Sequence, residues 1–312
     1  MNTTRRGFIP VMLTPFKDNG EVDFKALTEL TEYYIKAGAS GLFANCLSSE
    51  MYELSEKERL QVVKHVVDVA GGGVSVVATG TFGGEIGKQA DFVKTIYDQG
   101  VDAVIVITSL MAAQEESDDI FSANTFKLLE LTDNIPLGFY ECPVPYKRVI
   151  SPEQLKTFID TGRVVYHKDT CLDIDQVTRK IEAGKGHEFG LYDAYMGHAV
   201  ASLKAGAAGL SCIQGNYWPD LIVWLCDNFD NPELAEGVAK VQQFHIDNMD
   251  VMHNVYPITA KYFLQKRGLS LSAFTRKQGG TVQLTNDVKK DIDKLYADFK
   301  QLEEKLELSL KV

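Results

Sequence analysis

The chain has no apolar stretch that approaches the roughly 18–20 residues of a membrane-spanning helix. It also has no excess of positive charge: 32 Lys and Arg residues stand against 43 Asp and Glu residues, which gives a net charge of −11. Nucleic acids and anionic membranes repel such a protein. We therefore expect neither as a partner. A small anionic substrate remains compatible with this composition, because local N–H groups and single side chains determine the field at a binding site.

Cysteine is scarce and shows no pairing pattern. The five cysteines are widely spaced, their number is odd, and no Cys-x-x-Cys motif occurs. The N-terminal residues lack the long apolar core and cleavage site of a signal peptide. Together these absences predict reduced thiols and a cytoplasmic protein. No His/Cys spacing typical of a metal site is present, so we expect no bound metal.

Short apolar segments alternate with helical patterns along most of the chain. About eight strand–helix pairs follow one another at a spacing of roughly 25–30 residues. The expected strands are Phe8–Leu13, Gly41–Cys46, Val74–Thr79, Asp102–Thr108, Pro136–Tyr140, Arg163–Lys168, Glu188–Tyr192 and Ala208–Ile213. Apolar strands separated by helices indicate a parallel sheet buried on both faces. The pattern predicts an α/β fold, a (β/α)8 TIM barrel. An open doubly wound sheet is the alternative, but no Gly-x-Gly-x-x-Gly follows the first strand.

The alternation stops near Asn231. Three further helical patterns follow: Pro232–Val251, Pro257–Arg267 and Thr285–Leu308. We therefore predict a catalytic barrel domain over residues 1–230 and a C-terminal helical extension over residues 231–312. Apolar stripes at Met249–Met252 and Tyr256–Phe263 are expected in the core or in an interface between subunits.

Polar residues that follow the strands are the candidates for chemistry, because barrel active sites lie at the C-terminal ends of the strands. Lys168 is the only lysine among them. A lysine in apolar surroundings has a lowered pKa, and its neutral amine attacks carbonyl groups. Tyr140, at the end of the preceding strand, can transfer protons. The other candidates are Thr14, Ser48, Ser49, Thr79, Thr108, Glu141, Asp169, Thr170, Asp193, Gln214 and Asn216.

Several motifs give the chain a family resemblance over nearly its whole length. They are Phe8–Phe16 with its Thr-Pro-Phe ending, Ser48–Glu50 followed by Leu54–Arg59, Tyr140 with Pro143, Lys168–Thr170, and Gly206–Gly209. In this order and spacing they resemble the dihydrodipicolinate synthase / N-acetylneuraminate lyase family of class I aldolases. The resemblance implies a homotetramer that needs no metal or organic cofactor.

The resemblance also implies roles for individual residues. Lys168 would form an imine with a 2-oxo acid, usually pyruvate, and Tyr140 would relay protons. The Ser48 side chain and the N–H group of Ser49 would hold the carboxylate of that acid.

The chain departs from the family pattern at four places. Cys46 and Leu47 replace a glycine and a threonine, and Ser49 replaces a second glycine. The tyrosine that a neighbouring subunit contributes to the relay is missing from the segment 109–111. Pro145 stands where an arginine follows the motif tyrosine, although Lys147 and Arg148 come soon after it.

These departures suggest a different second substrate. Asp193, Tyr195, Ser211 and Asn216 indicate a polar pocket for hydroxyl groups, and Leu47 and Thr170 complete the predicted substrate-binding set. We predict a lyase for a sugar-acid-like 2-oxo acid, as in N-acetylneuraminate lyase. A dihydrodipicolinate synthase-like synthase and a 2-keto-3-deoxy sugar acid dehydratase are the enzymatic alternatives. A keto-acid-binding or assembly subunit without turnover is the non-enzymatic one.

Overall fold

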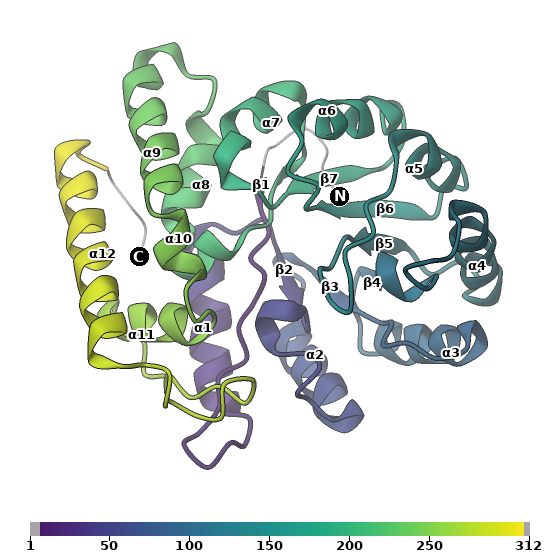
Figure 1. Ribbon diagram of the computed structural model, residues 1–312, viewed down its shortest axis with the longest axis horizontal. Helices are drawn as coiled ribbons and strands as arrows, with labels where there is room; N and C mark the ends of the chain where they lie inside the picture. Colours follow the sequence, from purple (N-terminus) through teal and green to yellow (C-terminus); the bar gives the residue numbers. More distant parts are fainter. Residues whose placement is uncertain (1–6, 309–312) are drawn as a thin grey trace.

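The computed structural model describes residues 7–308, which form a parallel eight-stranded barrel with a helical extension (Figure 1). The strands are β1 (Gly7–Phe8), β2 (Gly41–Ala44), β3 (Ser75–Thr79), β4 (Ala103–Ile107), β5 (Leu137–Tyr140), β6 (Val164–Asp169), β7 (Gly190–Asp193) and β8 (Gly209–Leu210). They are hydrogen-bonded in the order β1-β8-β7-β6-β5-β4-β3-β2. A parallel bridge between Val11 and Phe43 connects the two outer strands of this order. The predicted (β/α)8 barrel is therefore confirmed.

Helices alternate with the strands and cover the barrel. They are α1 (Phe24–Ala37), α2 (Glu56–Ala70), α3 (Ile86–Tyr97), α4 (Asp118–Leu131), α5 (Pro152–Ile159), α6 (Ile174–Ala183), α7 (Ala199–Ala205) and α8 (Pro219–Asn228). Local sequence sets several of their first residues. Ser55 and Glu58 form a capping box at the start of α2, and Ser151 and Gln154 form another at the start of α5.

The strands at the barrel seam are shorter than their apolar patterns predict. The segment Phe8–Leu13 contributes only two residues to β1, since Pro10 has no N–H for the ladder and the chain then pairs with β2 through Val11. At this seam Gly7 faces Gly209, and a Cβ on Gly209 would lie 1.6 Å from the Gly7 carbonyl oxygen. The close approach of β1 and β8 therefore requires glycine.

The interior of the barrel is filled mainly by aromatic and branched side chains. Phe43 and Tyr166 meet edge to face at 6.1 Å, and Tyr166 stacks on Tyr192 at 4.9 Å. Phe43 and Tyr166 are fully buried. This packed layer forms the floor beneath the C-terminal ends of the strands.

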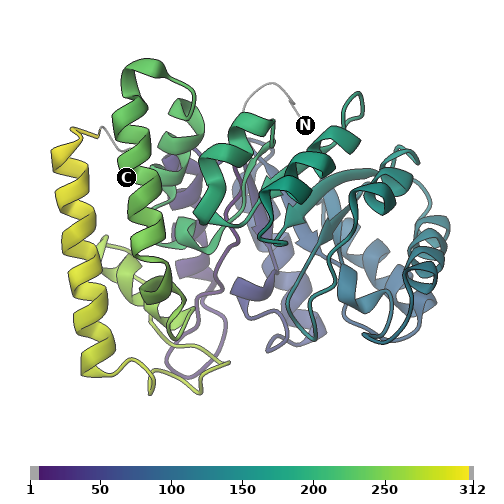
Figure 2. The same cartoon turned by 45° about the horizontal axis from the view of Figure 1, so that its top comes forward.

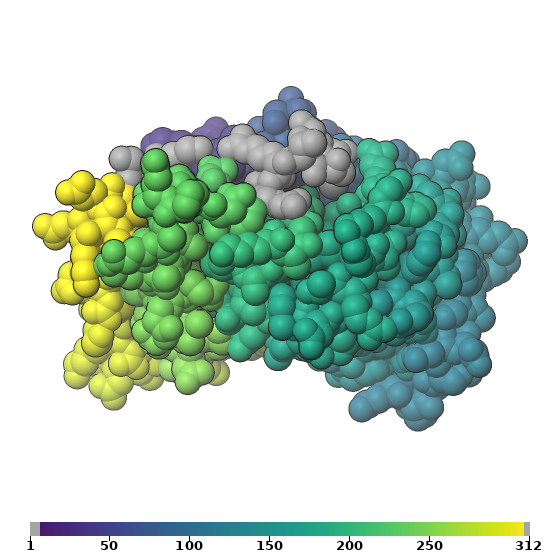
Figure 3. Space-filling view, turned by 90° about the horizontal axis from the view of Figure 1, so that it is seen from above, coloured from purple at the N-terminus to yellow at the C-terminus, as the bar shows by residue number. Residues whose placement is uncertain are grey.

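The C-terminal extension consists of α9 (Ala235–Asp247), α10 (Met249–His253), α11 (Ile258–Lys266) and α12 (Asn286–Lys305). Figures 2 and 3 show α9 and α12 together at one end of the molecule, beside the barrel. The continuous helix expected over Pro232–Val251 is instead a short 3-10 turn, α9 and α10, with the break at Asn248. Within residues 7–308, every helix is too short or too polar to cross a bilayer.

The apolar stripes of the extension pack inside the chain. Met252, Phe263 and Trp218 are fully buried, and Trp218 stacks on Phe299 of α12 at 5.4 Å. These side chains belong to the core, so they are not an exposed surface for another subunit.

Candidate functional site

A cavity of about 450 Å³ opens at the C-terminal ends of the strands. The residues that line it are Leu47, Ser48, Tyr140, Pro143, Lys147, Lys168, Thr170, Leu172, Ala194, Tyr195, Met196, Ile213, Gln214, Met249, His253, Tyr256, Pro257 and Lys277. A larger hollow of about 670 Å³ lies at the other end of the barrel, but its described lining contains no lysine, histidine or cysteine. The smaller cavity, at the strand ends where barrel enzymes carry their chemistry, is therefore the candidate active site.

Lys168 projects from β6 into this cavity with only 4% of its surface exposed. Its Nζ lies 4.1 Å from the centroid of the Tyr140 ring. Within residues 7–308 no carboxylate forms an ion pair with it. Burial lowers the pKa of Lys168, and nearby thiols, with Cys46 first, oppose this shift only in part. A larger fraction of the amine is therefore neutral, and nucleophilic, at a given pH.

Tyr140 stands beside Lys168 because β5 and β6 pair with these two residues in register. Burial raises the pKa of the Tyr140 phenol well above its usual value, and the neighbouring Cys142 adds to the effect. The phenol is therefore protonated at neutral pH. It can donate a proton to an oxygen atom of a carbonyl group that Lys168 attacks.

The 3-10 turn η1 (Leu47–Ser49) follows β2 and faces the cavity with its first two residues. In the described chain, the N–H groups of Leu47 and Ser48 donate to no protein acceptor. Ser49 is turned away: its N–H donates to the Cys46 carbonyl at 3.0 Å, and its hydroxyl to the Met12 carbonyl at 2.6 Å. The free N–H groups of this turn thus belong to Leu47 and Ser48, and not to Ser49 as we expected.

Two other predicted substrate-binding residues lie outside the cavity lining. The Ser211 hydroxyl donates to the Ile9 carbonyl at 2.8 Å and is fully buried. The Asp193 carboxylate accepts the N–H of Tyr195 at 2.9 Å and lies 2.9 Å from Nε2 of His198. Both side chains are bonded within the protein and organise the strand ends. Thr170 and Tyr195, by contrast, line the cavity.

The loop after β5 brings a lysine, but no arginine, to the cavity. Lys147 lines the cavity, and its Nζ donates to the Thr170 carbonyl at 2.7 Å. Arg148 points elsewhere, toward Asp118 and nearby backbone carbonyls of the segment that leads into α4. Pro145 carries no side-chain donor. Apart from Lys168, the lysines in the described lining are therefore Lys147 and Lys277. The same lining contains one histidine, His253.

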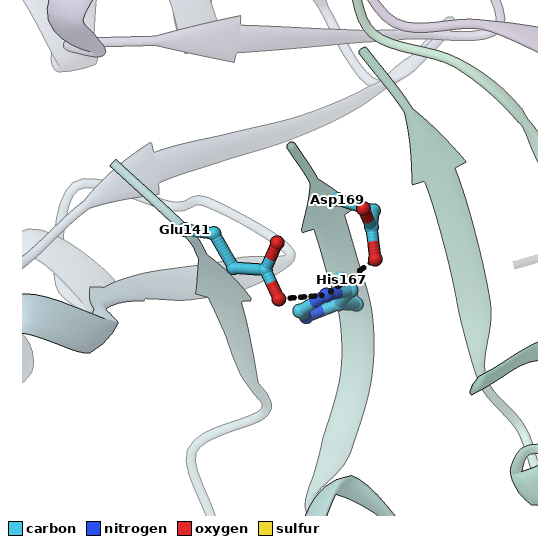
Figure 4. A group of neighbouring side chains, drawn as sticks. All are labelled: Glu141, His167 and Asp169. Atoms are coloured by element: carbon cyan, nitrogen blue, oxygen red, sulfur yellow. Dashed lines mark ion pairs between the residues drawn. The ribbon is translucent and has the colours of Figure 1, made fainter. Parts of the chain in front are cut away.

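A buried charge cluster lies behind the two catalytic candidates (Figure 4). It joins Glu141 after β5 to His167 and Asp169 of β6, and all three side chains are fully buried. Nε2 of His167 lies 3.3 Å from Glu141 and 3.4 Å from Asp169, in ion-pair range but outside hydrogen-bond geometry. Lys180 of α6 donates to Glu141 at 2.6 Å and to Asp169 at 2.7 Å.

The cluster is an internal ion-pair network. One possible ligand atom from each of Glu141, His167 and Asp169 lies within 4.8 Å of the other two, a spacing that would suit a metal ion. The ammonium group of Lys180, however, already binds both carboxylates. Burial alone would lower the pKa of Lys180, yet the Glu141 and Asp169 charges raise it overall. Burial would also lower the pKa of His167, and the same carboxylates raise it overall. Unlike Lys168, His167 is not part of the cavity lining. It faces away from the cavity, as strand alternation predicts.

The C-terminal extension supplies cavity residues that the sequence patterns did not reveal. Met249, His253, Tyr256 and Pro257 come from α10 and the segment after it, and Lys277 comes from the loop before α12. Glu50, at the end of the β2 loop, holds this part in place: it binds Nζ of Lys261 at 2.9 Å and the N–H of Lys277 at 2.9 Å. No local motif identified Tyr256 as a site residue, because only the fold brings it to the barrel mouth.

Comparison with known proteins agrees with this architecture. A model of the family described as "Dihydrodipicolinate synthetase family" matches residues 4–296. A 4-hydroxy-tetrahydrodipicolinate synthase of Clostridium novyi is 27% identical, over 87% of this chain and 90% of the relative. A protein of the same description from Ruegeria pomeroyi is 29% identical, over 85% and 89%.

Solved structures share the fold. A monomeric dihydrodipicolinate synthase variant superposes with a TM-score of 0.84 at 21% identity, covering 96% of this chain and 98% of the other. YagE, an E. coli prophage protein in complex with pyruvate, gives 0.82 at 21% identity over 96% and 98%. CdNal of Clostridium difficile, in complex with mannosamine, gives 0.82 at 16% identity over 94% and 99%. At these identities the likeness shows the fold alone.

Proposed function

Because this chain belongs to the dihydrodipicolinate synthetase family, we propose that it is a class I aldolase or lyase that forms an imine between Lys168 and a 2-oxo acid of the pyruvate type. One observation carries the proposal. Lys168 is a buried lysine without a carboxylate partner in the described chain, it opens into the cavity, and it lies 4.1 Å from the ring centroid of Tyr140.

The site residues suggest how the imine forms. The neutral amine of Lys168 attacks the 2-oxo carbon, and Tyr140 donates a proton to the oxygen that leaves as water. The free N–H groups of Leu47 and Ser48, with the Ser48 hydroxyl, are suited to the carboxylate of the 2-oxo acid. The protonated imine then accepts the electrons of a bond beside it, so a carbon–carbon bond can break or form there.

For the second substrate we propose a sugar-derived chain rich in hydroxyl groups, as in an N-acetylneuraminate lyase. The described cavity lining contains no arginine that could bind a second carboxylate at two points. It does contain Thr170, Tyr195 and Gln214, whose polar side chains are able to bind hydroxyl groups of a substrate.

A synthase acting on aspartate semialdehyde is the second candidate. The observation in its favour is Lys147, which lines the cavity near Thr170 and could neutralise a second carboxylate as a point charge.

A direct assay separates the two candidates. Pyruvate with aspartate semialdehyde is compared with a panel of sugar-derived 2-oxo acids, and Lys168→Ala is the inactive control for every substrate. We expect kcat/KM for the semialdehyde to stay below about 10⁴ M⁻¹s⁻¹, the lower end for a physiological substrate. A higher value that depends on Lys168 would favour the synthase and contradict the proposed sugar-acid substrate.

A further inference from the structure

Tyr256 lies in the segment between α10 and α11, and its side chain lines the same cavity as Lys168, Tyr140 and Ser48. It comes from the C-terminal extension and not from the barrel. The imine chemistry described above uses Tyr140 to donate and accept protons, but Tyr140 is buried and needs a partner that returns its proton. Tyr256 brings a second phenol to the cavity that Tyr140 lines.

The hydrogen bonds of Asn216 determine what the Tyr256 hydroxyl can do. Oδ1 of Asn216 accepts from the Tyr34 hydroxyl at 2.5 Å, while Nδ2 donates to the Val11 carbonyl at 2.9 Å and to Oη of Tyr256 at 2.6 Å. A carbonyl only accepts, so the amide of Asn216 has this orientation and no other. The Tyr256 oxygen is therefore an acceptor in this contact. Its own proton remains available to a group in the cavity.

The backbone around Tyr256 is held in a strained shape. Val255, a β-branched residue, has a φ of 47°, in the left-handed region that such residues rarely adopt. The Gln278 side chain donates to the carbonyls of Val255 and Tyr256, at 3.1 and 2.9 Å. Strain of this kind persists where surrounding contacts impose it, and such sites are often functional.

Tyr256 is also electrostatically coupled to its neighbours in the cavity. Burial raises the pKa of Tyr256 well above its usual value, and the adjacent Ser48 side chain opposes that shift. Burial likewise raises the pKa of Tyr140, and Tyr256 is among the groups that add to it.

We propose that Tyr256 is a catalytic acid–base residue that exchanges protons with Tyr140, so that one chain carries the whole proton path. This inference rests on the proposed imine chemistry. When the carbinolamine breaks its C–O bond, the leaving hydroxyl takes the Tyr140 proton and departs as water, which leaves an iminium ion and a Tyr140 phenolate. The Tyr256 proton then moves to Tyr140. The negative charge moves to the Tyr256 oxygen, to which Asn216 donates.

The same oxygen then acts as a base: with pyruvate alone it takes a proton from the methyl group of the iminium ion, and the C–H electrons pass into the enamine. When a carbon–carbon bond breaks, the substrate hydroxyl releases its proton to the phenolate and becomes a carbonyl, while the bond electrons pass into the enamine. Leu47, in the cavity lining, has no hydroxyl group, and the hydroxyl of Thr170 donates to the Glu141 carbonyl at 2.6 Å.

Exchange of the methyl protons of pyruvate in D2O, followed by proton NMR, tests the proposal without knowledge of the second substrate. Tyr256→Phe keeps the ring and removes the hydroxyl. We expect this variant to retain borohydride-trapped pyruvate on Lys168, while methyl exchange slows by about 10²-fold or more. Tyr217→Phe is the matched control: its buried hydroxyl bonds the Met252 carbonyl at 2.7 Å but does not line the cavity. Its exchange rate should equal that of the wild type.

The outcomes distinguish a failure of the proposed role of Tyr256 from a failure of the imine chemistry. If the wild type traps no pyruvate, the imine chemistry itself is wrong. If trapping is intact and Tyr256→Phe exchanges at the wild-type rate, only the role of Tyr256 is wrong. If Tyr256→Phe loses trapping as well, Tyr256 supports binding or folding, which also overturns the proposal. Replacement of Tyr256 by 3,5-difluorotyrosine, a more acidic phenol, should move the pH profile of exchange to lower pH, and an unchanged profile would count against it.

Discussion

Lys168 differs from the other buried lysines in what surrounds its ammonium group. Lys180 binds two carboxylates, and Lys261 binds Glu50 at 2.9 Å and the Phe274 carbonyl at 2.8 Å. Both are therefore structural cations. Lys168 faces an aromatic ring and thiols instead, in a cavity that a small molecule can enter. Its surroundings favour the neutral amine, which is the reactive form.

A pH dependence follows from this environment. Burial lowers the pKa of Lys168 below the ordinary value of 10.5, so its neutral fraction reaches its maximum at a lower pH than that of a free lysine. We expect the rate of imine formation with limiting pyruvate, measured by borohydride trapping, to rise with pH and level off below 10.5. A rate that still rises with a midpoint at or above 10.5 would contradict the effect of burial.

At the residue level, the sequence predicted several of the residues that the structure brings to the cavity. The cavity is lined by residues at the ends of strands or just after them, a position that is visible in the apolar pattern: Lys168, Tyr140, Ser48, Leu47 and Thr170.

Ser49 and Ser211 follow strand ends too, but their hydroxyls have partners within the protein. The hydroxyls of Ser49 and Ser211 donate to backbone carbonyls of the first barrel segment. Such pairings between distant segments leave no local signal. Tyr256 was missed for the same reason.

Among the elements, the pair β5–β6 has the most direct influence on the site. Glu141 joins them: its carboxylate accepts the N–H groups of Ile150 and Thr170 at 3.1 and 3.0 Å and binds Lys180. The Thr170 hydroxyl donates to the Glu141 carbonyl at 2.6 Å. This network holds the end of β5, with Tyr140, against the end of β6, with Lys168.

Glu141→Gln should destabilise the protein strongly. The amide keeps the shape but leaves the Lys180 cation with one carboxylate partner, and breaking a buried ion pair costs about 3–5 kcal/mol. Urea unfolding at a fixed protomer concentration measures this loss.

The matched control is Glu153→Gln, which removes a carboxylate from the exposed ion pair with Arg179 and should leave stability unchanged. A Glu141→Gln variant as stable as this control would show that the network does not hold the two strands together.

The boundaries of helices and strands could be predicted only where a local sequence signal sets them. Helix starts agree with the sequence where capping residues occur, as at Ser55 and Ser151. Strands β1 and β8 are shorter than their apolar runs, because barrel closure and not hydrophobicity decides where pairing ends.

For the whole molecule, the extension matters as much as the barrel. Lys261 and the N–H of Lys277 both bind Glu50, so the extension is fixed to the mouth of the barrel and completes the cavity wall. The family and the barrel were predictable because strand-end motifs recur at regular spacing, and both predictions are confirmed.

We predict that the protein is a homotetramer, as the family resemblance implies. Exposed apolar side chains that could support subunit contacts include Ile120 and Phe126 of α4, at 40% and 42% exposure. Sedimentation velocity at micromolar concentration should give the mass of four chains. A single species with the mass of one chain would contradict this prediction, although Tyr256 would still leave each chain with its own proton path.

Trapping of the imine tests most directly whether Lys168 is the nucleophile. The protein is incubated with pyruvate and borohydride, weighed intact and mapped by peptide mass spectrometry, with Lys168→Ala as the control. We expect a single reduced pyruvate adduct, located on Lys168 and absent from the variant. No gain in mass, or an adduct on another lysine that survives in Lys168→Ala, would contradict it.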